Sequence, residues 1–151
     1  MRPEEIRPDT KLATIIGYNA QTGRSRRYFN TLMKEQNINA TAIALNIKDE
    51  HFGFTMQNLA KSKVDKMILE PEFKELVLKY CDSSNSDLRV DIIEIIDGKI
   101  VGINLDDELK NLPLDISLWD LNMIEVAKMM IVANRWYSAK IELDNIPLMI
   151  K

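Results

Sequence analysis

Three short apolar runs alternate with segments of helical periodicity in the first half of the chain, and this alternation restricts the fold more than any other feature. The runs lie at residues 12–17, 41–45 and 64–69, and the patterns between them predict helices at 24–36 and 49–62. A strand–helix–strand order joins parallel strands through crossover helices. We therefore expect an α/β fold of three layers (α/β/α), in which helices cover both faces of a mostly parallel sheet.

A β-hairpin is expected to complete this sheet. Asp97 and Gly98 separate two segments rich in isoleucine, at 90–96 and 99–104, and an Asp-Gly pair in this position favours a tight hairpin turn. The hairpin adds one antiparallel strand to the βαβαβ order. Between the third apolar run and the hairpin, apolar residues recur at helical spacing, which predicts an amphipathic helix over 72–81.

A long apolar helix is predicted near the end of the sequence. Residues 121–137 carry apolar side chains around almost the whole helix circumference, so this helix needs cover on more than one side. We expect it to pack back on the sheet and to leave apolar surface for a second copy, which favours a homodimer. A single domain is then expected, made of a polar lead at 1–10, an α/β unit at 11–106, an irregular linker at 107–120 and C-terminal helices at 121–151, with a short last helix at 143–150.

Composition and motifs argue against several classes of protein. The 20 Lys and Arg against 23 Asp and Glu give a net charge of −3, which provides no basic field for nucleic acid. None of the 5 glycines forms a G-x-G pair, so the sequence contains neither a dinucleotide-binding fingerprint nor a phosphate-binding loop. Cys81 is the single cysteine, which argues against an internal disulfide and a multi-cysteine zinc site. His51 is the single histidine, so a Ser-His-Asp triad would have only one possible base. The sequence has no apolar stretch of membrane-spanning length, and a cytoplasmic location is expected.

The order of several short motifs resembles that of shikimate dehydrogenases. The motifs are Ile16-Gly17 followed by Ser25 and Asn30, then Phe73-Lys74-Glu75, then Val90-x-x-Ile93, and then Asp97-Gly98-Lys99-x-x-Gly102-x-Asn104-x-Asp106. The resemblance covers residues 11–106 and 121–150. In that family the NAD(P)-binding domain follows the last aspartate. The resemblance therefore implies a substrate-binding domain and a C-terminal helix, with the nicotinamide domain missing between them.

The resemblance also implies a set of site residues. Lys74 falls at the position of the catalytic lysine and Asp106 at that of its partner aspartate. The substrate-binding positions are Gly23, Ser25, Glu70, Asp91 and Lys128. At these positions the family has serine for Gly23, threonine for Glu70, asparagine for Asp91 and glutamine for Lys128. The Lys74 and Asp106 pair thus lies among altered polar neighbours.

Each of these residues also has a purely structural interpretation. By periodicity alone, Lys74 is a solvated side chain on its helix, and Asp106 is a helix N-cap. Glu125 and Lys128 are three residues apart and can form an ion pair within one helix. Arg24 opens a run of arginines at a helix start, where free backbone N–H groups favour an anion, but it can equally be an ordinary surface charge.

Three functions remain open at this point. The first is a non-catalytic module that binds a small anionic or polyhydroxylated metabolite. The second is an oligomeric interaction or regulatory protein. The third is a subunit of a shikimate or quinate dehydrogenase-type oxidoreductase of aromatic amino acid biosynthesis, whose nicotinamide domain is a separate chain. Oxidation of an alcohol needs a proton relay and a hydride acceptor. Lys74 and Asp106 can serve the first need, while NADP would have to come with a partner chain.

Overall fold

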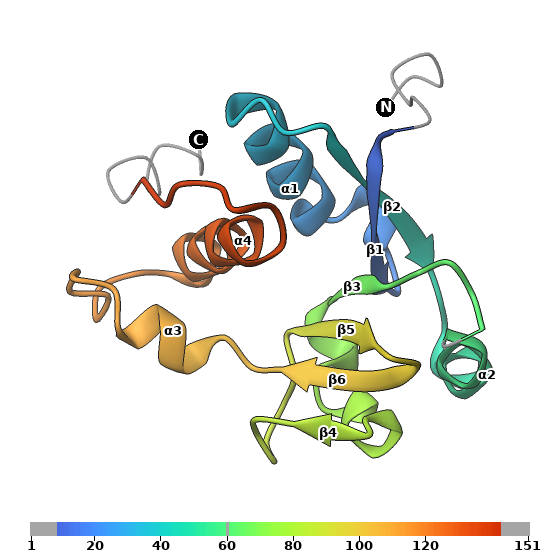
Figure 1. Ribbon diagram of the computed structural model, residues 1–151. Coiled ribbons are helices and arrows are strands. Elements are labelled where there is room, and N and C mark those ends of the chain that lie inside the picture. Colours follow the sequence, from blue (N-terminus) through green and yellow to red (C-terminus); the bar gives the residue numbers. More distant parts are fainter. Residues whose placement is uncertain (1–8, 60, 143–151) are drawn as a thin grey trace.

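A six-stranded sheet in the order β2-β1-β3-β5-β6-β4 forms the centre of the protein, as seen in a computed structural model that describes residues 9–59 and 61–142 (Figure 1). Strand β5 runs antiparallel to both β3 and β6, and the other neighbouring strands are parallel. The mostly parallel sheet with one antiparallel strand is therefore confirmed. The strands are β1 (Lys11–Gly17), β2 (Ala40–Asn46), β3 (Lys66–Leu69), β4 (Ser83–Ser84), β5 (Ile92–Ile96) and β6 (Lys99–Ile103).

Helices cover both faces of the sheet, which confirms the three-layer α/β/α arrangement (Figure 1). One face packs against α1 and α4 through Ile15 and Ile68, while the neighbouring Ile16 and Leu69 point to the opposite face and pack there with residues of α2 and two 3₁₀ helices. This division follows from the alternation of side chains along each strand. The helices are α1 (Arg24–Glu35), α2 (Asp49–Leu59), α3 (Asp106–Lys110) and α4 (Leu121–Tyr137), with 3₁₀ helices η2 (Ala20–Thr22), η3 (Pro71–Phe73) and η4 (Leu76–Tyr80).

The hairpin and the long C-terminal helix lie where the sequence placed them. Asp97 and Gly98 both have positive φ, at 52° and 75°, as the expected tight turn requires. Helix α4 begins at the cap Asp120, whose side chain accepts a hydrogen bond from the backbone N–H of Met123. Every residue from 126 to 133 is buried within the one chain. A homodimer stays a prediction, since most of the apolar helix is covered without one.

The α-helix predicted over 72–81 is wrong. This segment forms η3 and η4 instead, with Lys74 and Glu75 between them. The cause is a long-range hydrogen bond, because the carbonyl of Lys74 accepts from the N–H of Val90 at 2.8 Å. That carbonyl is therefore not used by Leu78, whose N–H bonds to Glu75 at 3.2 Å in the tighter 3₁₀ pattern. The departure brings the Lys74 side chain inward.

Two further expectations need correction. Residues 107–110, in the expected irregular linker, form α3 together with Asp106, and the short strand β4 is an element that the sequence did not predict. Asp106 is not the N-cap of α3, because Leu105 holds that position and the side chain of Asn104 accepts from the N–H of Asp106 at 2.8 Å. The short helix expected at 143–150 lies outside the described residues. No helix among those described is both long and apolar enough to span a membrane.

Candidate functional site

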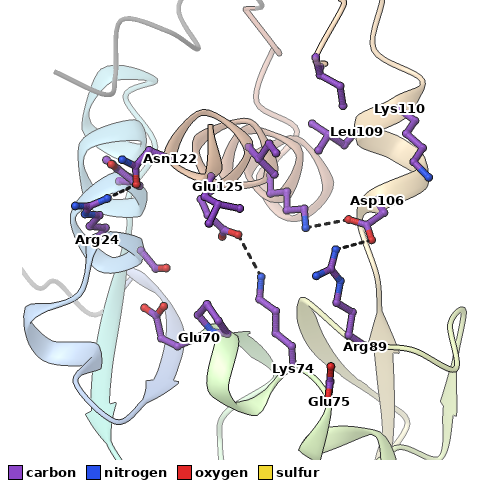
Figure 2. Close-up of a pocket in the computed structure, with 17 residues that line it drawn as sticks. Arg24, Glu70, Lys74, Glu75, Arg89, Asp106, Leu109, Lys110, Asn122 and Glu125 are labelled. Carbon is purple, nitrogen blue, oxygen red and sulfur yellow. Dashed lines mark hydrogen bonds and ion pairs between the residues drawn. The ribbon is translucent and has the colours of Figure 1, made fainter. Parts of the chain in front are cut away.

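A cavity of about 690 Å³ lies where β1, β3 and β6 end, beneath the first half of α4 and beside the start of α1 (Figure 2). The carboxyl ends of parallel strands meet at one sheet edge, and ligands bind there in open α/β folds. The cavity brings together many of the side chains that the sequence singled out. Its polar lining includes Arg24, Ser25, Glu70, Lys74, Arg89, Asp106, Lys110, Asn122, Glu125 and Lys128.

Lys74 reaches the cavity from the turn between η3 and η4. It is 7% exposed, so the expectation of a solvated lysine is wrong. Its Nζ lies 3.0 Å from Oδ1 of Asp91 and 3.4 Å from Oε1 of Glu125. Burial acts to lower the pKa of Lys74, but the two carboxylates outweigh burial and raise this pKa. Lys74 is therefore a protonated ammonium held by two anions.

Asp91 anchors the buried cations although it does not line the cavity itself. Its Oδ1 lies 3.2 Å from Nζ of Lys128 as well as 3.0 Å from Lys74, and its Oδ2 accepts from the N–H of Leu105 at 2.6 Å. Burial acts to raise the pKa of Asp91, but the two lysines and this backbone hydrogen bond lower it below its ordinary value. One carboxylate thus fixes the positions of two ammonium groups.

Lys128 and Arg89 hold Asp106 at the end of β6. Nζ of Lys128 lies 3.0 Å from Oδ1 of Asp106, and Nη2 of Arg89 lies 3.1 Å from Oδ2. These interactions lower the pKa of Asp106 against the opposing effect of burial. Lys74 and Asp106 form no direct ion pair; Asp91 and Lys128 connect them.

The expected ion pair between Glu125 and Lys128 within α4 is not formed. Glu125 turns to Lys74, while Lys128 bonds to Asp91 and Asp106. The reason is burial: Lys128 is 4% exposed and points into the fold, where its partners are Asp91, directly before β5, and Asp106, after β6. Lys128 is thus part of the site rather than of a surface ion pair.

Glu70 lies on the opposite side of the cavity, directly after β3. Its Oε1 is buried and has no hydrogen-bond partner among the described residues. Burial raises the pKa of Glu70, and the hydroxyl of Ser25 opposes this effect. Ser25, in the first turn of α1, is 7% exposed and lines the same cavity. This side therefore differs from the lysine side in having an unpaired acceptor.

Gly23 and Arg24 mark the edge of the site. Gly23 is the N-cap of α1, and a Cβ there would lie 3.1 Å from Oε1 of Glu70. It lines a neighbouring cavity of about 490 Å³ and not the main one. Arg24 lines both cavities and donates a hydrogen bond to the side chain of Asn122 on α4.

Sequence reasoning missed Arg89 and Asn122 as site residues. Arg89 precedes Asp91 by two residues, and in extended chain such residues face the same side, so the spacing contained a usable signal. Asn122 had no comparable signal, because its role depends on how α4 packs against α1. The two lysines, the arginines and the carboxylates together offer closely spaced donors and acceptors, an arrangement that can hold several hydroxyl groups at once.

Comparison with known proteins supports the resemblance. No protein-family model matches the chain. The shikimate dehydrogenase of Sulfurisphaera tokodaii is 33% identical over 103 residues, which are 68% of this chain and 38% of that protein. The chain thus spans less than half the length of this curated relative.

Solved structures agree with the sequence match. Shikimate dehydrogenase from Aquifex aeolicus has a TM-score of 0.60 at 26% identity, over 76% of this chain and 44% of that one. The Listeria monocytogenes enzyme, in complex with shikimate and NAD, has the same fold, with a TM-score of 0.60 at 18% identity over 74% of this chain and 42% of that one. About two-thirds of this chain is thus similar in sequence and structure to proteins that are named shikimate dehydrogenase.

Proposed function

We propose that this chain is a substrate-binding module that holds a small anionic or polyhydroxylated metabolite in the cavity at the carboxyl ends of β1, β3 and β6. One observation carries the proposal: Lys74 and Lys128 are buried beside the cavity with their ammonium groups fixed by Asp91. A buried ion-pair cluster is costly to desolvate and is a poor device for stability alone. Ligand binding gives a reason for its presence.

The lining favours a ligand with several hydroxyl groups. Nζ of Lys74 and Nζ of Lys128 each have donor capacity beyond their carboxylate partners, since an ammonium group has three N–H bonds. Glu125 and Asp106 offer acceptors on the same side. A hydroxyl group both donates and accepts, so a polyol can join this cluster without leaving a buried charge unpaired. Arg24 lies at the edge of the cavity, where it also lines the neighbouring cavity, and it can attract an anionic group to that edge.

The proposed module is non-catalytic when it acts alone. Oxidation or reduction of an alcohol needs a hydride carrier, and the sequence lacks the glycine-rich fingerprint that binds a dinucleotide. A second candidate is favoured by the presence of Lys74 and Asp106 on one cavity. In that alternative the chain is the substrate-binding subunit of an oxidoreductase, and a separate chain supplies NADP.

A binding experiment tests the first proposal. Shikimate, quinate and carbocyclic polyols are titrated into the full chain and followed by calorimetry. We expect saturable binding by at least one of them, and we expect Lys74→Met to weaken it by about ten- to a hundredfold, as for the loss of a hydrogen bond to a charged group. The matched control is Lys99→Met, because Lys99 is exposed in the hairpin, outside the residues that line the cavity. Equal affinity in Lys74→Met and Lys99→Met would contradict the proposal.

A cofactor titration tests what both proposals assume, namely that the chain alone does not bind a nicotinamide cofactor. Titration of NADPH into the chain, followed by cofactor fluorescence, is expected to show no saturable binding. Micromolar binding by the chain alone would favour an enzyme that holds its own cofactor. Light scattering at micromolar concentration separately tests the expected homodimer, which predicts twice the 17.4 kDa mass of one chain.

A further inference from the structure

The carboxyl group of Glu70 is the one charged group on the cavity wall with a buried and unpartnered oxygen among the described residues. The other charged groups that reach deep into the cavity have partners. Lys74 is held by Asp91 and Glu125, and Lys128 by Asp91 and Asp106. A buried acceptor without a donor is unfavourable, so a ligand that supplies a donor at this point gains binding free energy.

Glu70 is fixed in this position by its surroundings. Its backbone N–H donates to the carbonyl of Ile16 at 2.9 Å, and its carbonyl accepts from the N–H of Phe73 at 3.0 Å. Its side chain passes close to Gly17, where an added Cβ would lie 2.5 Å from Cγ of Glu70. The side chain therefore lies in a narrow passage, and Figure 2 shows its carboxyl group directed toward the start of α1.

The groups around the carboxyl do not neutralise it. The facing groups are the Ser25 hydroxyl, the carboxylates of Glu72 and Glu125, and the Lys74 ammonium. Lys74 is already shared by Asp91 and Glu125, while Glu72 accepts a hydrogen bond from the N–H of Tyr18 at 2.7 Å. Arg24, at the edge of this side, donates its hydrogen bond to the side chain of Asn122. The groups directly around the Glu70 carboxyl are therefore mostly acceptors, and the other side of the cavity holds the paired lysines.

We infer, on the basis of the proposed function, that Glu70 forms a specificity subsite that accepts a hydrogen bond from a hydroxyl or ammonium group of the ligand and rejects a carboxylate there. A carboxylate at this point would place like charges together in a buried space, which is strongly unfavourable. A hydroxyl group satisfies the unpaired oxygen, and an ammonium group also neutralises its charge.

Three ligands with one carbocyclic ring distinguish these cases. They are shikimate, its primary-alcohol analogue and its aminomethyl analogue, each titrated into the full chain by calorimetry at neutral pH. The variants are Glu70→Gln, which replaces the carboxylate by a neutral amide of the same shape, and the control Glu35→Gln, on the exposed end of α1. Urea unfolding of each variant establishes that it is folded.

We expect the wild type to bind the alcohol or the amine at least about tenfold more tightly than shikimate, because like charges at short range oppose the carboxylate. Glu70→Gln is expected to remove most of this preference, whereas Glu35→Gln retains it. Tighter binding of the amine than of the alcohol identifies an ammonium group as the donor, and the reverse order identifies a hydroxyl group.

Two results would overturn the inference in different ways. If all three ligands bind and the ratio of their affinities is the same in the wild type and Glu70→Gln, then Glu70 selects nothing, although the proposed binding function stands. If no ligand binds to the wild type or to either folded variant, the proposed function itself fails for this ligand class, and the inference fails with it.

Discussion

The two sides of the cavity differ in whether their buried polar groups have partners. On the lysine side, each ammonium group contacts two carboxylates, and Asp91 joins both pairs with additional support from the backbone N–H of Leu105. On the Glu70 side, a carboxyl oxygen is buried without a partner in the described part of the chain. The first arrangement fixes side chains in place, while the second leaves a carboxyl oxygen that can accept a hydrogen bond from a bound ligand.

This difference explains how a cavity lined by many charged side chains can coexist with a stable fold. The ion pairs of Lys74 and Lys128 with Asp91 and Asp106 link the residue after η3, the end of β6 and helix α4. We expect these links to keep the shape of the cavity before any ligand binds. Preorganisation of this kind lowers the cost of binding. The open side supplies selectivity, because an unpaired group distinguishes ligands that complement it from those that do not.

Removal of Asp91 should destabilise the protein more than any other substitution considered, because both buried lysines lose a partner. Asp91→Ala leaves Lys74 with Glu125 alone and Lys128 with Asp106 alone, both in a buried setting. We expect the free energy of unfolding to fall by about 3–5 kcal/mol, as when one partner of a buried ion pair is lost. Urea denaturation measures this, with Asp87→Ala on the exposed loop as the control. Equal stability of the two variants would show that the cluster does not hold the site together.

A methyl group at Gly17 should disturb the open side. Gly17→Ala places a Cβ 2.5 Å from Cγ of Glu70, and the neighbouring backbone bonds prevent Glu70 from moving away freely. We expect a loss of about 1–3 kcal/mol in unfolding free energy from overpacking. Gly53→Ala is the matched control, because its Cβ would meet only the hydroxyl end of the Tyr80 side chain, at 2.8 Å. A greater loss in Gly53→Ala would argue against a confined Glu70.

Loss of the second partner of Lys74 should have a moderate effect. Glu125→Gln leaves Lys74 paired with Asp91 at 3.0 Å, and the Glu125 side chain is itself 30% exposed. The expected cost in unfolding free energy is about 0.5–1.5 kcal/mol, the net value of one hydrogen bond. Chemical denaturation compares this variant with Asp91→Ala, and a larger loss in Glu125→Gln would reverse the assigned roles of the two carboxylates.

Asp91 and Glu70 should make the unfolding free energy depend on pH in opposite directions, and the effect of Glu70 should be the smallest of the predicted effects. The lowered pKa of Asp91 means that its contribution is complete above its ordinary value of 3.8 and is lost as the pH falls through the lower folded pKa. The raised pKa of Glu70 means that its protonated form favours folding, and this contribution is lost as the pH rises above 4.5 and through the folded pKa.

Glu70→Gln should therefore be more stable than the wild type at neutral pH. The gain is expected to be below about 1 kcal/mol, because solvent screens a partly exposed carboxylate. Thermal unfolding across the acid range measures it, and the gain should vanish where Glu70 is protonated. In contrast, the difference in unfolding free energy between Asp91→Ala and the wild type should become smaller as the pH falls below 3.8. Lower stability of Glu70→Gln than of the wild type at neutral pH would contradict the account in which one carboxyl oxygen of Glu70 is buried without a partner.

The arrangement of the sheet could be predicted because local patterns determine it. The three apolar runs, the helical spacing before and after the second of them, and the Asp97-Gly98 pair each depend on a few neighbouring residues, and the structure has strands, helices and a turn at these places. The break of the helix at Lys74 could not be predicted in this way. It depends on a hydrogen bond to Val90, which is distant in the sequence.

The members of the site were easier to predict than their partners. The motif order placed Lys74, Asp91, Asp106 and Lys128 together, but their pairing depends on how α4 lies over the end of β6. An unusual carboxylate at position 70 was visible in the sequence, whereas its unpaired oxygen is a property of the packed structure alone.

The most direct test of the account is to observe where a ligand binds. A titration of the ¹⁵N-labelled chain with shikimate and its primary-alcohol analogue, followed by amide chemical shifts, reports every perturbed position. We predict saturable changes at Ser25, Lys74 and Lys128, which line the cavity, and none at the hairpin turn around Gly98. Changes confined to the neighbouring arginine-lined cavity around Asn30, or no saturable change up to millimolar concentration, would contradict the account.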